Sequence, residues 1–401
     1  MLKRVLFIVN MEEENKAGLF TATHQRIKGI KEHLNEMQVY SLRYYDGLFV
    51  RLVKKLLNKK VYYKTKKEFI YDGVTYRYLY LRTSVFQKLF PNVALILFII
   101  FYTLIHQKQL KKFDLISAHW GHPQGYFAYW LNKCLRIPYV ITLHGSDIHT
   151  IPHKNKIVKK LTLRSLGNSK HNFFVSKNLW SSAYELGYKE NNYSILYNGI
   201  DISKFIPLSK NQKKSCKGDL NLYGQVVGFI GNLIEIKRAD KLGEIFNRIK
   251  LGFDRDVSFL VVGDGELKEQ IKNQCNQYGV TVNFVGKVLP EEVVNYINAM
   301  DILILPSKKE GFGRVILEAN SCGVLALGSS NGGIPEAIGN REYVVNDIES
   351  FEELFANKVI KFLEEGYNQK NLIKRIQENF SSEKIIKKEI EIYEDIIEEN
   401  K

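Results

Sequence analysis

The stretch Asp301–Gly323, DILILPSKKEGFGRVILEANSCG, predicts a buried strand, a turn that contains glycine, and then a helix. Residues 301–307 are an apolar run of strand length, and residues 313–323 show helical spacing. The turn contains Gly311 and Gly313, and glycine lets backbone amides come close to a ligand. Amides at the start of a helix favour negatively charged oxygens, so this turn is a candidate anion site.

Two carboxylates lie on either side of this turn. Glu310 precedes the glycines, and Glu318 falls about one and a half turns into the helix. A loop and a helix can thus present both carboxylates to separate points of one polyhydroxy ligand, such as a sugar joined to phosphate. The alternative is an N-capping Glu310 followed by an unrelated, exposed Glu318, and spacing alone does not decide between them.

The same alternation of apolar runs and helical stretches extends along nearly the whole chain. Helical stretches separate most predicted strands, which indicates an α/β fold with mainly parallel sheets. The polar, basic segment 201–222 interrupts this pattern, and we place a domain boundary there. The predicted strands are 4–10, 38–42, 74–81, 114–120, 138–145, 171–176 and 193–199, followed by 226–232, 257–265, 282–288, 301–307 and 324–330.

The composition is that of a soluble globular protein, and 401 residues suit two domains. The apolar run near the N-terminus is too short for the core of a signal peptide, so we expect a cytoplasmic protein. Widely spaced cysteines favour reduced thiols there. The four cysteines are Cys134, Cys216, Cys275 and Cys322.

The net charge of +15 is unevenly distributed. Residues 1–200 contain 31 Lys and Arg against 12 Asp and Glu, a net charge of +19, whereas residues 201–401 contain 27 against 31, a net charge of −4. Basic and aromatic residues are mixed in 43–69 and 76–82, which suits the headgroup layer of an anionic membrane. Single-stranded nucleic acid, a phosphorylated substrate and a merely solvated surface are the alternatives. We favour the membrane and expect no nucleic-acid partner.

The uncharged run Val93–Ile105 has thirteen residues. A membrane-spanning helix needs about 20 apolar residues, so this run is too short to span a bilayer by itself. We interpret it as a helix of the domain core, and shallow insertion into a membrane is the alternative.

Further candidates follow other predicted strands, at the edge where open parallel sheets bind their ligands. Gly231 and Lys237 follow the strand 226–232 and are placed like a phosphate-binding pair, although a lysine near a helix start can also be merely solvated. Gly332 and Gly333 precede a short helix and offer another place where backbone can approach phosphate.

Three histidines follow strands of the first half. His119 and His122 lie just past 114–120, and His144 lies just past 138–145, three residues before Asp147. These histidines have no carboxylate or thiolate at a usual ligand spacing, so we predict no metal site.

An ordered set of motifs covers nearly the whole chain, and it resembles the family-four glycosyltransferases, which are retaining enzymes of the GT-B fold. The resemblance implies two Rossmann-like, doubly wound domains that face each other across a cleft. In the first half, residues 113–125 and 136–148 look most similar to bacterial enzymes that build cell-surface polysaccharides of the capsule or teichuronic acid type. The motifs are the glycine loop near Gly18, HGSD (144–147), NGID (198–201), GNLIEIK (231–237), VGDG (262–265), FVGK (284–287), EGFGRVILEA (310–319) and GGIPE (332–336).

The resemblance also implies a division of labour. Residues 1–200 would bind the acceptor and be joined by a C-terminal helix, 381–401, while residues 201–380 would bind the nucleotide sugar. The expected reaction moves a sugar from a UDP- or GDP-linked donor to a glycan or lipid-linked acceptor. No cofactor or metal is expected. Attachment to the inner face of the cell membrane is an open option.

By the same resemblance, Glu318 would hold the ribose hydroxyls, Lys237 the diphosphate, and Glu310 the donor sugar together with backbone amides. His144 would face the donor sugar near its anomeric carbon. His144, Lys237 and Glu310 would thus form the catalytic set. The remaining implied positions are the amides of Gly311, Phe312 and Gly313 for the sugar, Gly18 for the phosphate, the backbone near Lys287 for the base, and His119, His122 and Asp147 for the acceptor.

One position departs from the family pattern. Many members have an arginine five residues before the lysine, where this chain has Asn232, and Arg238 is a candidate to supply the missing charge. No nucleophile is evident near the donor sugar, so the family implies retention by front-face attack, with the diphosphate helping to deprotonate the acceptor. The competing hypotheses are a non-catalytic sugar- or nucleotide-binding module, a GT-B epimerase or hydrolase, and an RNA-binding protein.

Overall fold

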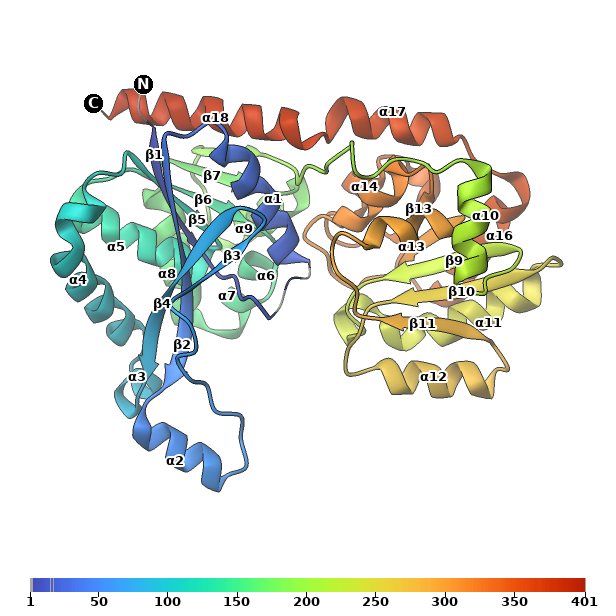
Figure 1. Cartoon of the computed structure of the whole chain (residues 1–401), viewed down its shortest axis with the longest axis horizontal. Coiled ribbons are helices and arrows are strands. Elements are labelled where there is room, and N and C mark those ends of the chain that lie inside the picture. Colours follow the sequence, from blue (N-terminus) through green and yellow to red (C-terminus); the bar gives the residue numbers. More distant parts are fainter. Residues whose placement is uncertain (1–2, 15, 17, 401) are drawn as a thin grey trace. The chain divides into compact units, whose positions relative to one another are not determined.

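The computed structural model describes residues 3–14, 16 and 18–400. The chain forms two compact units, which Figure 1 shows in colours that follow the sequence. Unit 1 comprises Met1–Val175, Leu179–Leu196 and Ile386–Lys401, and unit 2 comprises Ser176–Asn178 and Tyr197–Ile385. The sequence had predicted 1–200 with 381–401 for one domain and 201–380 for the other. The observed divisions fall a few residues earlier at the linker and a few residues later near the C-terminus.

Unit 1 is built on a sheet with the strand order β3-β4-β2-β1-β5-β6-β7-β8. Neighbouring strands are parallel, except that β3 pairs antiparallel with β4. The central strand β1 is buried from Val5 to Val9, as expected for a parallel strand that helices cover on both faces. The strands are β1 (Arg4–Val9), β2 (Glu36–Asp46), β3 (Glu68–Tyr71), β4 (Val74–Thr83), β5 (Leu115–His119), β6 (Tyr139–Leu143), β7 (His171–Phe174) and β8 (Tyr193–Ile195).

Helices connect these strands, and the C-terminal helix α18 adds residues from the far end of the chain to unit 1 (Figure 1). The elements are α1 (Leu19–Lys31), α2 (Leu48–Leu56), α3 (Val85–Leu89), α4 (Pro91–Leu110), η1 (Gly121–Gly125), α5 (Tyr126–Leu135), α6 (Ser146–His149), α7 (Ile151–Lys154), α8 (Lys156–Asn168), α9 (Lys177–Leu186) and α18 (Ser382–Glu399).

The structure forms a helix at Val93–Ile105, but most of its side chains are not buried in the core as expected. Helix α4 buries Leu95, Ile99 and Thr103, but only 22% of its most apolar window is buried. By length and composition α4 could cross a membrane. The uncharged run is shorter than the helix, because α4 continues past Ile105 into polar residues without a break.

Strand β3 was not predicted. It forms a hairpin with β4 through Asp72 and Gly73, both of which have positive φ values, 45° and 73°. An Asp-Gly pair between apolar runs is a strong hairpin signal, so the sequence did contain the information.

Unit 2 contains a parallel sheet with the order β11-β10-β9-β12-β13-β14. The short edge strand β14 was also not predicted. The strands are β9 (Gln225–Ile230), β10 (Val257–Val262), β11 (Val282–Gly286), β12 (Ile302–Leu305), β13 (Leu325–Ser329) and β14 (Val344–Val345). The helices are α10 (Lys210–Asp219), η2 (Glu235–Lys237), η3 (Ala239–Lys241), α11 (Leu242–Gly252), α12 (Lys268–Gln277), α13 (Val293–Ala299), α14 (Arg314–Ser321), α15 (Ile334–Ile338), η4 (Arg341–Tyr343), α16 (Phe351–Glu365) and α17 (Gln369–Asn379).

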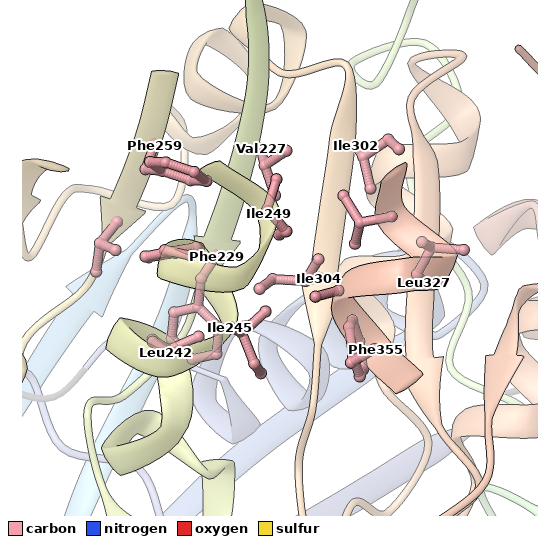
Figure 2. Packing of buried hydrophobic residues seen from close by; sticks show 14 of the residues in the cluster. Val227, Phe229, Leu242, Ile245, Ile249, Phe259, Ile302, Ile304, Leu327 and Phe355 are labelled. Carbon is pink, nitrogen blue, oxygen red and sulfur yellow. The ribbon is translucent and has the colours of Figure 1, made fainter. Parts of the chain in front are cut away.

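The core on one face of this sheet is formed by β9, β10 and β12 against α11 and α16, and Figure 2 shows its packing. Phe246 of α11 stacks on Phe259 of β10 with ring centroids 4.6 Å apart, and Phe355 of α16 is fully buried in the same cluster. This packing fixes the strands, and with them the loops that leave their carboxyl ends.

Candidate active site

The topology of unit 2 places the predicted donor residues at one point. From β9 the chain proceeds to β10 and β11 on one side, and then returns to place β12 on the other side of β9. The gap between β9 and β12 is therefore the topological switch point, where open α/β sheets bind ligands beyond the carboxyl ends of the strands. Lys237 follows β9 and Glu310 follows β12, so both predicted residues leave the sheet at this point.

Lys237 and Glu310 are in direct contact. The Lys237 ammonium donates to the Glu310 carboxylate, and the two side chains are 23% and 19% exposed. A cation and an anion that are both partly exposed at the switch point can exchange this contact for a ligand that carries phosphate and hydroxyl groups. The sequence predicted both residues for one ligand, and the structure brings them together.

The loop after Glu310 is held by close backbone packing. Gly333 N–H donates to the Glu310 carbonyl at 3.0 Å, and a Cβ on Gly332 would lie 2.2 Å from that carbonyl oxygen, so only glycine fits there. Gly313 has a φ of 89° and directly precedes α14. Phe312 is 2% exposed and stacks on Tyr197 at 5.0 Å, so its side chain belongs to the interior and only its backbone can serve a ligand.

Glu318 is only 9% exposed on α14, and the alternative of an unrelated, exposed glutamate is wrong. The other half of that alternative is also wrong, because Gly313 and not Glu310 occupies the N-cap position. Arg314 lies one turn before Glu318, with its Nε 3.2 Å from Oε1 of the carboxylate. Burial lowers the pKa of Arg314, while Glu318 and Asp201 oppose that shift. Arg314 was not predicted from the sequence, although its spacing of four residues from Glu318 is that of a helical ion pair.

The other predicted donor residues lie at the same edge but differ in surroundings. Asn232 and Lys287 are exposed after β9 and β11. Arg238 was predicted to replace the missing cation, yet its guanidinium donates to Asp347 at 2.5 Å and lies 4.2 Å from the ring of Phe351. These partners occupy the guanidinium of Arg238, whereas Lys237 contacts Glu310 directly.

Unit 1 has a switch point of its own, between β1 and β5. His119 ends β5, and His144 follows β6, which is the next strand in the sheet. Nδ1 of His119 lies 3.1 Å from Nε2 of His144, and the rings are stacked with centroids 5.3 Å apart. One ring must donate and the other accept, which fixes complementary tautomers for the pair.

Burial keeps these histidines neutral. It lowers the pKa of His119 well below the usual value, that of His144 to about 3 and that of His122 to about 4. The charge of Arg26 lowers the pKa values of His119 and His144 further. His119 is only 2% exposed, so the predicted direct contact of His119 with the acceptor is not supported, whereas His122 and His144 are partly exposed and neutral.

Asp147 was predicted to bind the acceptor, and the structure contradicts this. Its carboxylate is 1% exposed and accepts backbone N–H bonds from Gly145 at 2.8 Å, His144 at 3.2 Å and Gly121 at 3.3 Å. Asp147 thus joins the two turns that carry the histidines. Burial raises its pKa to about 6 against the opposing effect of these amides.

Gly18 directly precedes α1 with a φ of 52°, and a Cβ there would meet open space. Gly18 is thus exposed at the start of a helix. Within residues 3–14, 16 and 18–400, no three His, Cys, Asp or Glu side chains gather as a metal site would require.

Sequence reasoning missed a buried polar network beneath the histidines. Arg26 of α1 donates to Glu389 at 2.5 Å, Tyr393 donates to the same carboxylate at 2.8 Å, and the Tyr393 and Ser117 hydroxyls are 2.8 Å apart. Ser117 lies two residues before His119 on β5. Glu389 and Tyr393 interrupt the apolar stripe of α18, and a buried glutamate on such a stripe is the signal that could have revealed the network.

The neutral histidines predict a specific loss of stability in acid. His144 has a pKa near 3 in the folded protein and 6.5 as its reference value, so the unfolded chain binds more protons between these values. Its contribution to stability is complete above pH 6.5 and is lost as the pH falls, by about 2 kcal/mol between pH 7 and pH 5. The His144→Asn variant should therefore lose less stability than the wild type over this range.

Urea unfolding followed by tryptophan fluorescence measures this effect, because Trp120, Trp130 and Trp180 all belong to unit 1. The raised pKa of Asp147 has the opposite effect, since it removes stability as the pH rises. Asp147 is present in both the wild type and His144→Asn, so its effect cancels in the comparison. His153 is exposed, and His153→Asn is the control that should retain the wild-type slope. Equal slopes for wild type and His144→Asn would contradict the assignment.

Two doubly wound α/β units, each with such a switch point, form the GT-B fold. The fold matches the structure of Anabaena Alr3699/HepE in complex with UDP, with a TM-score of 0.74, 17% identity, and coverage of 98% of this chain and 100% of that chain. It also matches sucrose-phosphate synthase from Thermosynechococcus elongatus, with a TM-score of 0.75, 17% identity, and coverage of 98% and 99%. At these identities the likeness establishes the fold.

The family follows from the sequence. Residues 60–204 match the model "Glycosyltransferase Family 4", and residues 211–379 match the model "Glycosyl transferases group 1". Together the two matches cover well over half of the chain, which belongs to the family-four, group 1 glycosyltransferases and is an enzyme of this class.

Several curated relatives come from bacteria. The chain is 29% identical to the N-acetyl-alpha-D-glucosaminyl L-malate synthase of Bacillus anthracis, over 73% of this chain and 77% of the relative. It is 30% identical to the putative teichuronic acid biosynthesis glycosyltransferase TuaC of Bacillus subtilis, over 58% and 57%. Protein CapJ of Staphylococcus aureus is 26% identical over 66% of each chain.

Proposed function

We propose that this glycosyltransferase retains the anomeric configuration and moves a sugar from a UDP- or GDP-linked donor to a glycan or lipid-linked acceptor. The acceptor belongs to a bacterial cell-surface polysaccharide, and the enzyme acts in the cytoplasm at the inner face of the cell membrane. The observation that carries the donor half is the contact between Lys237 and Glu310 at the switch point of unit 2, beside the buried Glu318.

Each of these residues has a part in donor binding. Glu318, held by Arg314, accepts hydrogen bonds from the ribose hydroxyls. The donor displaces the contact between Lys237 and Glu310, so that the ammonium meets the diphosphate and the carboxylate meets sugar hydroxyls. The solved structures of HepE with UDP support a uracil nucleotide, and GDP is the alternative.

The proposed chemistry follows from where charge develops. The bond between the anomeric carbon and the phosphate oxygen breaks, and its electron pair passes to the diphosphate. Lys237 and the amides of Gly311–Gly313 stabilise that charge, and a preorganised cation in a site with little water is worth several kcal/mol. The acceptor hydroxyl attacks the same face of the sugar and passes its proton to the departing phosphate oxygen. No metal is required, since Lys237 and the amides supply the positive charge.

Unit 1 is proposed to position the acceptor hydroxyl and the sugar. His144 contacts the donor sugar near its anomeric carbon, and the neutral ring of His119 fixes its tautomer. His122 contributes to the acceptor site, whereas Asp147 acts by shaping the two turns.

The similarity to an L-malate synthase suggests a second candidate acceptor, a small soluble hydroxy acid. The name of TuaC, a putative teichuronic acid biosynthesis glycosyltransferase, supports a surface polysaccharide instead. The strongly basic first half of the chain favours an acceptor held at an anionic membrane. Product analysis with L-malate and with a bacterial lipid extract separates the two candidates.

Nucleotide binding tests the donor half directly. UDP at about 100 times its Kd should stabilise the wild type by about 2.7 kcal/mol, seen as a raised Tm. The Glu318→Ala variant should bind UDP about 10- to 100-fold more weakly, because it loses hydrogen bonds to a charged group. Glu269 is exposed on α12, and Glu269→Ala is the matched control that should keep wild-type affinity. Equal UDP affinity in all three proteins would refute the assignment of Glu318, and a larger shift with GDP would identify the base as guanine.

A further inference from the structure

Two long strands of unit 1 extend beyond the rest of its sheet. In the register of the sheet, Ser41 of β2 pairs with Val9 at the end of β1, and β2 then continues for five more residues to Asp46. At about 3.3 Å per residue, this extension is about 16 Å long. Strand β4 accompanies it, and Asp46 pairs with Thr83. In contrast, β5 ends at about the level of β1, because Ala118 pairs with Ile8 and the next residue, His119, pairs with Thr142.

Helices α2 and α3 begin together at the tip of this extension, as Figure 1 shows for unit 1. Gly47 N–H donates to the Thr83 carbonyl at 2.9 Å; Gly47 directly precedes α2, and Thr83 lies two residues before the start of α3. Helix α4 follows α3 after one residue. The carboxyl edge that carries His119 and His144 is therefore continuous with a projection made of α2, α3 and the start of α4.

This projection and the outer face of α4 expose an unusual number of large apolar side chains. Each is at least 46% exposed, and those of α4 recur at helical spacing along one face. A soluble protein rarely leaves such a continuous apolar surface uncovered unless it binds a partner there. The side chains are Leu48, Phe49, Leu52, Leu56 and Leu57 around α2, Val85, Phe86, Leu89 and Phe90 around α3, and Val93, Leu97, Phe101, Leu104 and Ile105 on α4.

The inner face of α4 is packed on unit 1. Leu95 and Ile99 are buried, Phe98 contacts Phe127 of α5 with centroids 6.4 Å apart, and Tyr102 contacts Tyr40 of β2 at 6.0 Å. A helix held along one face by a folded unit cannot cross a bilayer in that state, although its length would allow it. Its free face can lie in the plane of a membrane surface.

The charge around α2 identifies the partner. Residues 47–67 contain eight Lys and Arg and no Asp or Glu. Lys55, Lys59 and Lys60 are exposed beside the apolar side chains, and the exposed Tyr62 and Tyr63 lie against Lys54 and Arg51 at 4.8 and 5.1 Å. Basic residues and aromatic rings around an apolar surface match the headgroup layer of an anionic leaflet.

We propose that α2, α3 and the outer face of α4, with the basic segment 47–67, form a docking surface for an anionic lipid bilayer. This inference rests on the proposed function, and it specifies how the acceptor is reached. The docking surface projects from the same carboxyl edge that carries His119 and His144. Contact of α2 with the headgroups holds that edge above the bilayer, within reach of an acceptor whose lipid end stays in the membrane.

Flotation with lipid vesicles tests the docking surface. Wild-type protein should float with vesicles that contain about 30% phosphatidylserine, and at least about tenfold less with phosphatidylcholine alone, since each basic residue adds to anionic-surface binding. The variant Leu97→Glu/Phe101→Glu/Leu104→Glu should lose flotation at least about tenfold. The variant Lys55→Glu/Lys59→Glu/Lys60→Glu should lose the preference for phosphatidylserine.

Matched controls lie elsewhere on the molecule. Leu251 is 76% exposed in unit 2, and Leu251→Glu should float like the wild type. The charge-matched variant Lys370→Glu/Lys374→Glu/Lys387→Glu, at exposed positions outside the docking surface, should also keep wild-type flotation. Loss of flotation in this second control would show a dependence on net charge alone and would overturn the proposal.

Two further results would overturn the proposal. The first is a wild-type protein that fails to float with phosphatidylserine vesicles. The second is a wild-type homodimer that Leu97→Glu/Phe101→Glu/Leu104→Glu converts to a monomer, because a second copy of the chain would then cover this surface. UDP binding, measured by Tm on the same proteins, separates this inference from the proposed function. A chain that binds UDP without floating refutes only the docking surface, and one that floats without binding UDP refutes the donor assignment.

Discussion

The Lys237→Ala variant is expected to lower kcat by about 100- to 1000-fold, with a smaller change in KM. The diphosphate gains most of its charge as the bond to the sugar breaks, so the ammonium stabilises the transition state more than the bound donor. Its contact with Glu310 in the free protein places it at the switch point before any donor arrives. Glycosyl transfer from a panel of radiolabelled UDP- and GDP-sugars to a bacterial lipid extract measures the effect.

The control for this prediction is Lys272→Ala. Lys272 pairs with Glu269 on α12, away from the switch point, and its loss should leave kcat within a factor of two or so, as for other surface substitutions. A Lys237→Ala enzyme with wild-type kcat would show that the leaving group is stabilised by other means. If KM rose with kcat unchanged, Lys237 would only bind the donor and would not take part in the chemistry.

The Glu389→Ala variant is expected to lower the free energy of unfolding of unit 1 by about 3 to 5 kcal/mol. Glu389 is fully buried and pairs with Arg26, which is 5% exposed, so the substitution leaves a buried guanidinium without its counter-charge. It also removes an acceptor of the Tyr393 hydroxyl. Urea unfolding monitored by the tryptophans, all of which lie in unit 1, reports on this unit specifically.

Glu391 is exposed on the same helix, and Glu391→Ala should be within about 0.5 kcal/mol of the wild type. The double variant Arg26→Met/Glu389→Met should recover much of the lost stability, because replacing a whole buried ion pair with apolar groups is often neutral. If Glu389→Ala and Glu391→Ala were equally stable, the buried network would not hold α18 on unit 1.

Much of the fold could be predicted because buried parallel strands produce a strong local signal. The runs 114–120, 138–145 and 301–307 were each predicted as strands, and β5, β6 and β12 lie within them. Strand β14 was missed because its two residues are too few to form a pattern, and β3 was missed because the hairpin signal of Asp72 and Gly73 was overlooked.

The donor residues were predictable for a similar reason. Glu310 and Lys237 follow strands that are easily recognised, and a parallel sheet brings its carboxyl ends to one edge. Their mutual contact, and the support of Glu318 by Arg314, depend on side-chain packing that spacing does not determine.

The errors concern burial, which the sequence does not report directly. Asp147 was assigned to the acceptor because it follows a strand end, but three backbone amides occupy it. Helix α4 has apolar side chains on its exposed face as well as on its buried face, so the apolar run in the sequence does not show which face is exposed. Glu389 lies more than 200 residues from the histidines in sequence, and only the folded chain brings α18 to β5.

A crystal structure of the protein with UDP tests the central claim most directly. We expect the ribose hydroxyls within hydrogen-bond distance of the Glu318 carboxylate, and the diphosphate against the Lys237 ammonium and the amides of Gly311–Gly313, with the contact between Lys237 and Glu310 broken. UDP bound to unit 2 away from the carboxyl ends of β9 and β12, or bound only to unit 1, would contradict the account.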